Sequence, residues 1–381
     1  MKHMKIGIDA RLWSQTGVGR YIRNLIRELL TLDKSNAYVL FVLSSEKSEI
    51  LHQLKGIGGN NWQLEEVNIR WHSLAEQIRF PRILHSYNLD LMHFTYFSMP
   101  ILYSNPFVIT IHDLIPYHLA TGKASTLPYP FYATKRLGYK IILKKSAEKS
   151  QKIIVPLQAI KDDVIKTLNV NPEKVVVTKE GFEFTNSDSK STIDTSLLGK
   201  YFLYVGNAYP HKNIGNLIKA FRLLLKKEND STLVLVGRKD FFYNRLQTEL
   251  AGEDLSRIKF IFNATDQDLV KLYKNAVALV SASKMEGFGL VPLEAMSQGC
   301  IPVVSRIPAF QEVCSEAAIY FEPNSPEALA EKMHAVLSMD ASTRKEYLSR
   351  GKNRILHFSW KNTALETLKV YEDCDRLRPS K

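Results

Sequence analysis

Short apolar runs that alternate with helical patterns constrain the fold of this chain more than any other feature of its sequence. Each run is brief, rich in Val, Ile and Leu, and shows little alternation of apolar and polar residues. Such runs are typical of strands that are buried on both faces of a parallel sheet. The strands predicted in this way cover 5–9, 38–43, 91–94, 107–112, 152–155, 174–178, 201–206, 232–237, 258–263, 278–281, 301–305 and 319–321.

Amphipathic helices are predicted between these strands, because apolar residues recur there at the i, i+3, i+4, i+7 spacing of one helix face. This spacing is followed by Ile22, Leu25, Ile26, Leu29 and Leu30, and again by Ile214, Leu217, Ile218 and Phe221. Ser325, Pro326 and Glu327 are predicted to be the N-cap, first-turn proline and first-turn acid of a further helix. Strands that alternate with helices predict an α/β fold with parallel, doubly wound sheets.

The domain organisation follows from the length of 381 residues, which is too long for one ordinary core and suits two domains. The stretch 183–192 is polar, rich in Ser and Thr and without periodicity, so it is typical of a linker. We expect a first Rossmann-like domain over 1–183, a linker over 184–199 and a second Rossmann-like domain over 200–360. Two such domains face a cleft, and ligands bind at the carboxyl ends of the strands.

Composition limits the class of protein and of its partners. The formal net charge of +12 and the pI of about 9.3 suit nucleic acid, an anionic membrane surface or a phosphorylated substrate. Cys300, Cys314 and Cys374 are predicted to be reduced thiols, because they are few, odd in number and lack metal-binding spacing. We expect a cytoplasmic protein, since no stretch approaches the roughly twenty apolar residues of a membrane span and the N-terminus has no secretion signal.

The segment 281–295 carries the strongest functional signal. It combines the end of a strand, a turn with two glycines, and a helix predicted to begin at Pro292. Backbone N–H groups at a helix N-terminus bind anions, and glycines let a ligand approach the backbone. Glu286 and Glu294 border this anion position, and carboxylates are acceptors for sugar hydroxyls rather than for phosphate. The cluster therefore predicts a diphosphate flanked by two sugars. The alternative, an acid that only complements the helix dipole, would be the better interpretation of a lone acid.

The residues from Glu286 to Ala295 resemble the E-x7-E signature of the retaining GT-B glycosyltransferases, and are most similar to family four, the glycosyl transferases group 1. The resemblance implies that Glu286 holds hydroxyls of the donor sugar and that Glu294 holds the ribose of the nucleotide. It implies no metal and no cofactor besides the nucleotide-sugar donor. The donor-binding residues of this segment would be Glu286, Gly287, Phe288, Gly289, Leu290 and Glu294.

The turn after the first strand adds a second part of the predicted donor site. Gly17, Val18 and Gly19 lie where a strand leads into a helix, so their N–H groups can reach a phosphate. A glycine pair alone is ordinary in a tight turn, but the matching loop of the family lies against the donor diphosphate. A dinucleotide fingerprint is excluded, because the third glycine and the distant acid are missing.

His112 follows the strand 107–112, where a histidine is more often structural than functional. The match of 110–116 to the family implies instead that His112 donates a hydrogen bond to a sugar hydroxyl. Asp113 is expected to stabilise a turn or cap a helix.

The segment 204–213 supplies a cation. Lys212 is placed to neutralise a leaving diphosphate as a compact point charge, although a solvated surface lysine is the ordinary alternative. The family often has an arginine after the glycine and a basic pair before the asparagine, where this chain has Asn207 and His211. We expect donor contacts from Gly206, Asn207, His211 and Lys212, with His211 providing part of the second cationic contact.

Two further segments allow alternative interpretations. Residues 135–152 carry seven basic residues and one acid with apolar residues between them, which is typical of a helix at a membrane surface. A solvated helix face is an equally good interpretation of this segment. Asp266 and Asp268 resemble the D-x-D of metal-dependent transferases, but the helical pattern that follows favours a helix N-cap.

The resemblance implies a hexosyltransferase that retains the anomeric configuration and acts on a glycan or lipid-linked acceptor, as in polysaccharide, O-antigen or glycolipid assembly. The catalytic residues would be His112, Lys212 and Glu286. The first and third motifs are similar to those of mannosyltransferases, so GDP-mannose is the first choice of donor. UDP-glucose, UDP-galactose and UDP-N-acetylglucosamine remain open. In the GT-B fold the chain's end, here 361–381, crosses back onto the acceptor-binding first domain.

Two alternatives of other classes stay open at this point. One is a sugar-nucleotide epimerase of the same fold, and the other is a basic scaffold that binds membrane or RNA. Nucleic acid is not an expected partner, because the chain lacks an RNA-binding sheet motif and its charge is not gathered into one recognition helix. A peripheral contact between 135–152 and the inner face of a membrane is consistent with a lipid-linked acceptor.

Overall fold

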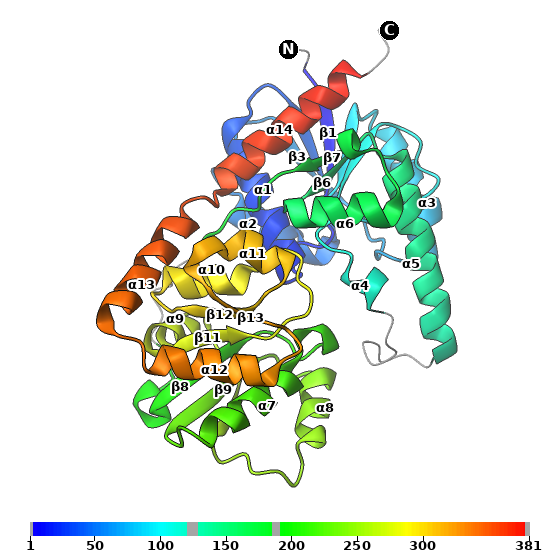
Figure 1. Cartoon of the computed structure of the whole chain (residues 1–381). Coiled ribbons are helices and arrows are strands. Elements are labelled where there is room, and N and C mark those ends of the chain that lie inside the picture. Colours follow the sequence, from blue (N-terminus) through cyan, green and yellow to red (C-terminus); the bar gives the residue numbers. More distant parts are fainter. Residues whose placement is uncertain (1–2, 120–128, 185–190, 378–381) are drawn as a thin grey trace. The chain divides into compact units, whose positions relative to one another are not determined.

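The computed structural model describes residues 3–119, 129–184 and 191–377, and these residues form two compact α/β units (Figure 1). The first unit holds 3–117, 129–181 and 358–377, and the second holds 118–119, 182–184 and 191–357. The second unit ends at 357 rather than at the predicted 360. The reason is packing, since Trp360 belongs to the core of the first unit and lies against Gly181.

Within the described residues, the first unit is built on seven parallel strands in the order β3-β2-β1-β4-β5-β6-β7. Ile6 of β1 is in register with Tyr38 of β2 on one side and with Leu91 of β4 on the other. The winding therefore reverses between β1 and β4, which is the switch point of this sheet. The strands are β1 Lys5–Asp9, β2 Ala37–Val42, β3 Trp62–Glu66, β4 Leu91–Phe94, β5 Phe107–Thr110, β6 Lys152–Val155 and β7 Val175–Val177.

The last helix of the chain packs against the first, which confirms the predicted return of the C-terminus to the first unit (Figure 1). The apolar stripe that begins at Ile22 shares one buried core with Val370 and Tyr371. The helices of this unit are α1 Gly17–Leu32, η1 Ser44–Glu46, α2 Lys47–Gln53, α3 Leu74–Ser86, α4 Ile115–His118 (whose last residue is counted with the second unit), α5 Tyr129–Lys149, α6 Gln158–Leu168, η3 Pro172–Lys174 and α14 Trp360–Arg376.

β3 is a strand that the sequence pattern did not predict. Its residues, Trp62–Glu66, mix aromatic and aliphatic positions with glutamine and two glutamates, so no continuous apolar run marks it. The strand lies at the edge of the sheet and pairs only with β2 among the described strands, which removes the need for burial on both faces. All of the strands that were predicted from the sequence are found, and their observed ends differ from the predicted ends by at most two residues.

The second unit is built on a sheet in the order β10-β9-β8-β11-β12-β13, all of whose described pairs are parallel. Leu203 of β8 is in register with Val234 of β9 and with Leu279 of β11, so the switch point lies between β8 and β11. The strands are β8 Lys200–Val205, β9 Ser231–Gly237, β10 Ile258–Phe262, β11 Ala278–Ser281, β12 Pro302–Ser305 and β13 Ile319–Phe321.

Helices connect these strands at the positions that the apolar spacing predicted. The N-cap assigned to Ser325 is confirmed, because its hydroxyl accepts from the backbone N–H of Ala328 at 3.1 Å. Two doubly wound parallel sheets thus confirm the predicted fold class. The helices are η4 Thr195–Leu198, η5 Pro210–Lys212, α7 Ile214–Leu225, α8 Phe241–Glu249, α9 Asp266–Asn275, α10 Leu290–Ser297, α11 Pro308–Cys314, η6 Ser315–Ala317, α12 Pro326–Leu337 and α13 Ala341–Ile355.

Much of the predicted linker 184–199 belongs to the second unit. Residues 185–190 lie outside the described residues. After them, the Ser191 hydroxyl and the Thr192 N–H donate to Asp268 Oδ1 at 2.8 and 2.9 Å. Asp268 also closes a capping box with the N-cap Thr265 at the start of α9. The D-x-D sequence therefore lies at a helix start, but the N-cap is Thr265 rather than an aspartate, and Asp268 ties the linker to the second unit.

Candidate active site

The switch point of the second sheet brings two of the predicted site loops together. β8 and β11 are neighbouring strands, so the loops 206–213 and 282–289 leave the same edge of the sheet side by side. The loops are joined directly, because the backbone N–H of Lys284 donates to the carbonyl of His211 at 2.8 Å. Asn213, at φ 57°, then turns the first loop into α7. This arrangement fixes the side chains between the two loops.

Lys212 and Glu286 form an ion pair across these loops. The Nζ atom of Lys212 donates to Oε1 and Oε2 of Glu286 at 2.7 and 2.8 Å. The two side chains are 18% and 13% exposed, so the pair is shielded from most water but can still be reached. An ammonium and a carboxylate at one place offer a charge for phosphate and an acceptor for hydroxyl groups.

The N-terminus of α10 lies directly beyond Glu286 and lacks a side-chain cap. Gly289 is the N-cap, no side chain caps the helix, and its first turn contains no acid. N–H groups in this situation, at the positive end of a helix dipole, attract anions. Gly289 has φ 101°, which favours glycine, and a Cβ there would lie 3.2 Å from the ring of Phe310. The helix begins at Leu290 rather than at Pro292, because the turn at Gly289 precedes the proline.

Glu294, predicted to hold a ribose, is more buried than Glu286. It is 6% exposed, and its Oε2 accepts a hydrogen bond from the Tyr273 hydroxyl at 2.9 Å. Tyr273 is itself fully buried and meets the ring of Phe184 edge to face. The sequence did not predict a role for Tyr273, because this residue lies in the apolar stripe of α9 and belongs to no motif. Its hydroxyl fixes the orientation of the Glu294 carboxylate.

Gly206 and Asn207 are held by two buried tyrosines. The Tyr204 hydroxyl donates to the Asn207 carbonyl at 2.7 Å, and the Tyr243 hydroxyl donates to the Gly206 carbonyl at 3.0 Å. The carbonyls of Gly206 and Asn207 therefore both accept hydrogen bonds from protein hydroxyls. Since an exposed carbonyl repels an anion, this satisfies one condition for a phosphate beside the loop.

His211 is not the second cation that we expected. Burial, together with the neighbouring charge of Lys212, lowers the pKa of His211 to about 4. The ring stacks on Tyr209 with the centroids 5.8 Å apart. A histidine with this pKa is neutral near pH 7, so Lys212 is the cation that this loop provides.

In the first unit, the predicted glycine turn leads into α1, which also has an N-cap residue without a side-chain hydrogen bond, Thr16. The two glycines differ in surroundings. A Cβ at Gly17 would meet nothing within 4 Å, whereas a Cβ at Gly19 would collide with the carbonyl of Trp13. Gly17 and Val18 can thus present their backbone to a ligand, and Gly19 lets the preceding loop pack on the helix.

His112 leaves the carboxyl end of β5 and is held by hydrogen bonds on both ring nitrogens. Nδ1 lies 2.8 Å from Oε1 of Glu180, and Nε2 lies 3.1 Å from the carbonyl of Thr95. Burial by itself would lower the pKa of His112, but the hydrogen bond and charge of Glu180 outweigh it and raise the pKa above its usual value. Asp113 accepts from the Ile115 N–H at 2.8 Å, which confirms the predicted turn.

An ion network beside the loop after β1 was not predicted from the sequence. Arg11 is 2% exposed and its Nη2 lies 2.7 Å from both Asp9 Oδ2 and Glu76 Oε1. The guanidinium also stacks over Phe80 at 4.0 Å. These contacts tie the loop after β1 to α3.

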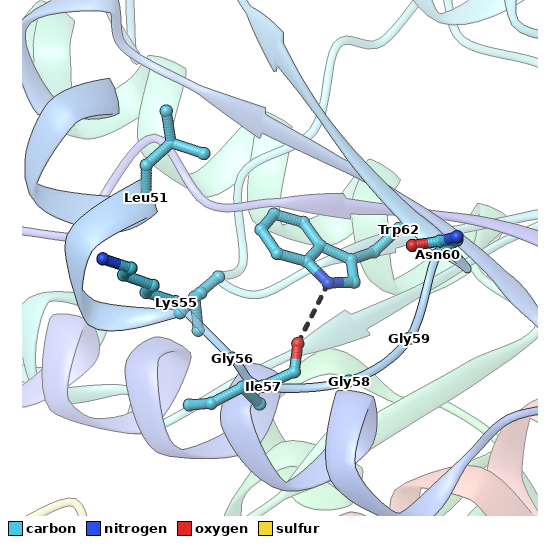
Figure 2. A pocket seen from close by; sticks show the side chains of 9 residues that line it. Leu51, Lys55, Gly56, Ile57, Gly58, Gly59, Asn60 and Trp62 are labelled. Atoms are coloured by element: carbon cyan, nitrogen blue, oxygen red, sulfur yellow. Dashed lines mark hydrogen bonds between the residues drawn. The ribbon is translucent and has the colours of Figure 1, made fainter.

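Other kinds of site are sparse in the described part of the chain. It contains no group of three or more His, Cys, Asp or Glu placed to hold a metal ion. Its helices include none that is both long and apolar enough to cross a bilayer. A surface cavity of about 540 Å³ precedes β3, where the Trp62 indole donates to the Ile57 carbonyl at 3.2 Å (Figure 2). It lies at the amino end of β3.

Two doubly wound units with site loops at the carboxyl ends of their strands are typical of nucleotide-dependent enzymes. The family model described as Glycosyltransferase Family 4 matches residues 15–184, and the model described as Glycosyl transferases group 1 matches residues 190–354. The two matches together take in both units. The chain therefore belongs to the family 4 glycosyltransferases, as its motifs predicted.

Its relatives include several mannosyltransferases. The chain is 30% identical over 259 residues to the O-antigen chain mannosyltransferase RfbU of Salmonella typhimurium, a match that covers 68% of this chain and 66% of that protein. It is 27% identical to O-antigen chain mannosyltransferase B of Escherichia coli, over 94% of this chain and 96% of that one. It is 23% identical to the GDP-mannose:cellobiosyl-diphosphopolyprenol alpha-mannosyltransferase of Xanthomonas oryzae, over 79% and 76% of the two chains.

Solved structures give the same fold. Sucrose-phosphate synthase from Thermosynechococcus elongatus superposes with a TM-score of 0.74 at 18% identity, over 99% of this chain and 100% of that chain. An Anabaena protein solved in complex with UDP and glucose gives a TM-score of 0.73 at 17% identity, over 97% and 100% of the two chains. At these identities the likeness shows the fold alone.

Proposed function

We propose that this chain transfers mannose from GDP-mannose to a hydroxyl group of a glycan or lipid-linked acceptor, with retention of the anomeric configuration. The observation that carries the proposal is the Lys212–Glu286 pair, which lies beside the uncapped N-terminus of α10. It provides a charge for phosphate and an acceptor for sugar hydroxyls. The names of the three relatives support mannose as the sugar, and the Xanthomonas name supports GDP-mannose as the donor.

In this proposal the pair opens when the donor binds. Lys212 turns to the diphosphate, and Glu286 accepts hydrogen bonds from hydroxyls of the mannose. The N–H groups at Gly289 and Leu290 bind a phosphate oxygen, and Glu294, oriented by Tyr273, accepts from the ribose. Separating the pair costs free energy, but Lys212 then gains the negatively charged diphosphate and Glu286 gains hydroxyl donors of the sugar. These new contacts offset the cost.

The proposed reaction is a front-side displacement. The bond between the anomeric carbon and the phosphate oxygen breaks, and the acceptor oxygen forms its bond to that carbon on the same face. The acceptor proton passes to the leaving phosphate oxygen, so GDP departs with the charge that Lys212 and the α10 N-terminus stabilise. Preorganised charges of this kind usually contribute more to catalysis than any other single effect. Gly17, Val18 and His112 are proposed to contact diphosphate and sugar from the first unit.

We propose that the acceptor is held at a membrane surface, with α5 as the contact. Leu137 and Ile141 lie one turn apart on this helix and are 61% and 48% exposed, and Lys144 and Lys145 continue the same stripe with exposed side chains. Apolar residues beside lysines suit an anionic lipid surface. Binding to vesicles with and without anionic lipid tests this contact. The double variant Leu137→Glu, Ile141→Glu should sediment less with anionic vesicles, and equal sedimentation would contradict the proposal.

The donor is tested by thermal stabilisation against GDP-mannose, UDP-glucose, UDP-galactose and UDP-N-acetylglucosamine. A ligand that binds only the folded protein raises the melting temperature by mass action, because it adds about 2.7 kcal/mol to the free energy of unfolding at a hundredfold excess over Kd. GDP-mannose should stabilise the protein most, and Glu286→Gln should lose the part of the shift that exceeds that of GDP. A larger shift with a UDP-sugar would reject GDP-mannose, and no shift with any of the four would reject the donor site itself.

A further inference from the structure

We infer that Glu180 is a positioning residue that keeps His112 protonated on both ring nitrogens, so that His112 acts as a fixed cation. The inference rests on the proposed function for its catalytic meaning, but its structural part stands without it. The geometric basis is the ion pair of 2.8 Å between Nδ1 of His112 and Oε1 of Glu180, whose side chains are 11% and 7% exposed.

The chemistry of the two partners decides the protonation of the ring. A carboxylate and a backbone carbonyl both only accept hydrogen bonds, and here they face Nδ1 and Nε2 respectively. A neutral imidazole has one N–H, so it would leave one of these acceptors facing a lone pair. Only the imidazolium donates to both. The cation is therefore the form that satisfies every polar group around the ring.

A second buried histidine one strand away provides a contrast. His93 of β4 has the Tyr371 hydroxyl 2.7 Å from Nδ1 and the Thr110 hydroxyl 2.8 Å from Nε2. Hydroxyls both donate and accept, so the neutral ring is satisfied, and burial lowers the pKa of His93 to about 3. The two histidines are similarly buried, and what differs is the carboxylate.

The surroundings of His112 hold the ring in place. Tyr21 of α1 meets it edge to face at 4.7 Å, and Tyr96 lies roughly parallel to it at 6.4 Å. The titratable groups around it include the carboxylates of Glu180 and Asp113, the neutral His93 and these two tyrosines. Both carboxylates favour the cation.

A cationic His112 changes what this residue can do in the proposed reaction. A charged donor forms hydrogen bonds roughly twice as strong as those of a neutral donor. The Nε2–H bond to Thr95 is the longer of the two at 3.1 Å, so a sugar hydroxyl can share that hydrogen while Glu180 keeps Nδ1. Glu180 thus acts through His112 and does not touch the substrate.

The test compares wild type with Glu180→Gln, Glu180→Asp and the control Glu183→Gln, which alters an exposed glutamate three residues further on. NMR of protein labelled at histidine, without any donor, should show the His112 imidazolium at about pH 7 in wild type. Glu180→Gln should lower the midpoint of this titration by one pH unit or more, a tenfold change in the proton-binding constant. Glu180→Asp should restore at least half of the shift, and Glu183→Gln should leave it unchanged.

The same variants are then assayed for GDP-mannose-dependent transfer across pH. The alkaline limb of kcat/KM should move to lower pH in Glu180→Gln by the same amount as the His112 titration, while activity at lower pH is retained. A neutral His112 in wild type near pH 7, or an alkaline limb that does not move, would overturn the inference. If the NMR shift is found but no nucleotide sugar is turned over, the proposed function fails while the cationic pair stands.

Discussion

The ion pair between Lys212 and Glu286 leads to a prediction that separates stability from catalysis. At an Nζ–Oε1 distance of 2.7 Å, the attraction at an effective dielectric constant of ~20 is roughly 6 kcal/mol. Desolvation of both groups and partial exposure offset most of it, which leaves a coupling of about 1 kcal/mol in the free protein. Lys212→Ala and Glu286→Gln should each therefore destabilise the free protein modestly. The double variant should be less destabilised than the sum of the two.

Activity should behave differently, because the two side chains act on different parts of the bound donor. Loss of one charged group that stabilises the leaving phosphate costs about 10²–10³-fold in kcat. Loss of a charged acceptor for sugar hydroxyls costs about 1.5–3 kcal/mol, or roughly 10–100-fold. These losses should multiply in the double variant, so that its turnover falls below that of either single variant.

The assay is release of GDP from GDP-mannose with acceptor present, combined with thermal unfolding of each variant. Lys284→Ala is the control, since Lys284 is an exposed lysine two positions before Glu286 and is assigned no contact with the donor. It should retain turnover within about threefold of wild type. A double variant no slower than Lys212→Ala would refute separate roles, and Lys212→Ala as active as Lys284→Ala would refute the assigned role of Lys212.

Three further predictions follow from the same structure. Gly19→Ala should destabilise the protein by at least ~2 kcal/mol, because the added Cβ would collide with the Trp13 carbonyl. Gly17→Ala should leave the melting temperature nearly unchanged, because a Cβ there would meet nothing within 4 Å. Equal melting temperatures of the two variants would contradict this contrast. Tyr273→Phe should raise the KM for the donor several-fold with little change in kcat, since only the hydrogen bond to Glu294 is lost, and a fall in kcat at unchanged KM would argue against a ribose contact. The raised pKa of His112 means that its pairing with Glu180 stabilises the fold fully below the unfolded histidine pKa of about 6.5 and ceases to do so as pH rises through the folded pKa. Glu180→Gln should accordingly lower the melting temperature more at about pH 6 than at about pH 9, and the opposite order would contradict the cation.

The sequence predicted the loops of the site better than the contacts within them. Glu286 and Lys212 were each found from local motifs, because a glycine turn and a helix start are written in consecutive residues. Their pairing was not predicted, since it depends on β8 lying next to β11 and joins residues 74 positions apart. The neutral state of His211 likewise depends on burial, which local sequence does not record.

The same distinction explains what was missed. Glu180 meets His112 across 68 positions, and Tyr273 meets Glu294 from a helix whose apolar stripe conceals it. β3 escaped prediction because an edge strand need not be apolar on both faces. Local patterns report backbone geometry and charge type, whereas protonation states and ligand-orienting contacts arise from the tertiary packing of distant segments.

The most direct test of the central claim is a transfer assay with GDP-mannose labelled in the sugar and a membrane extract rich in lipid-linked glycans as acceptor. We predict that label enters the glycan as an α-linked mannose, that GDP is released in equal amount, and that Glu286→Gln lowers both by roughly 10–100-fold. Incorporation that is unchanged in Glu286→Gln, or a β-linked product from wild type, would contradict it.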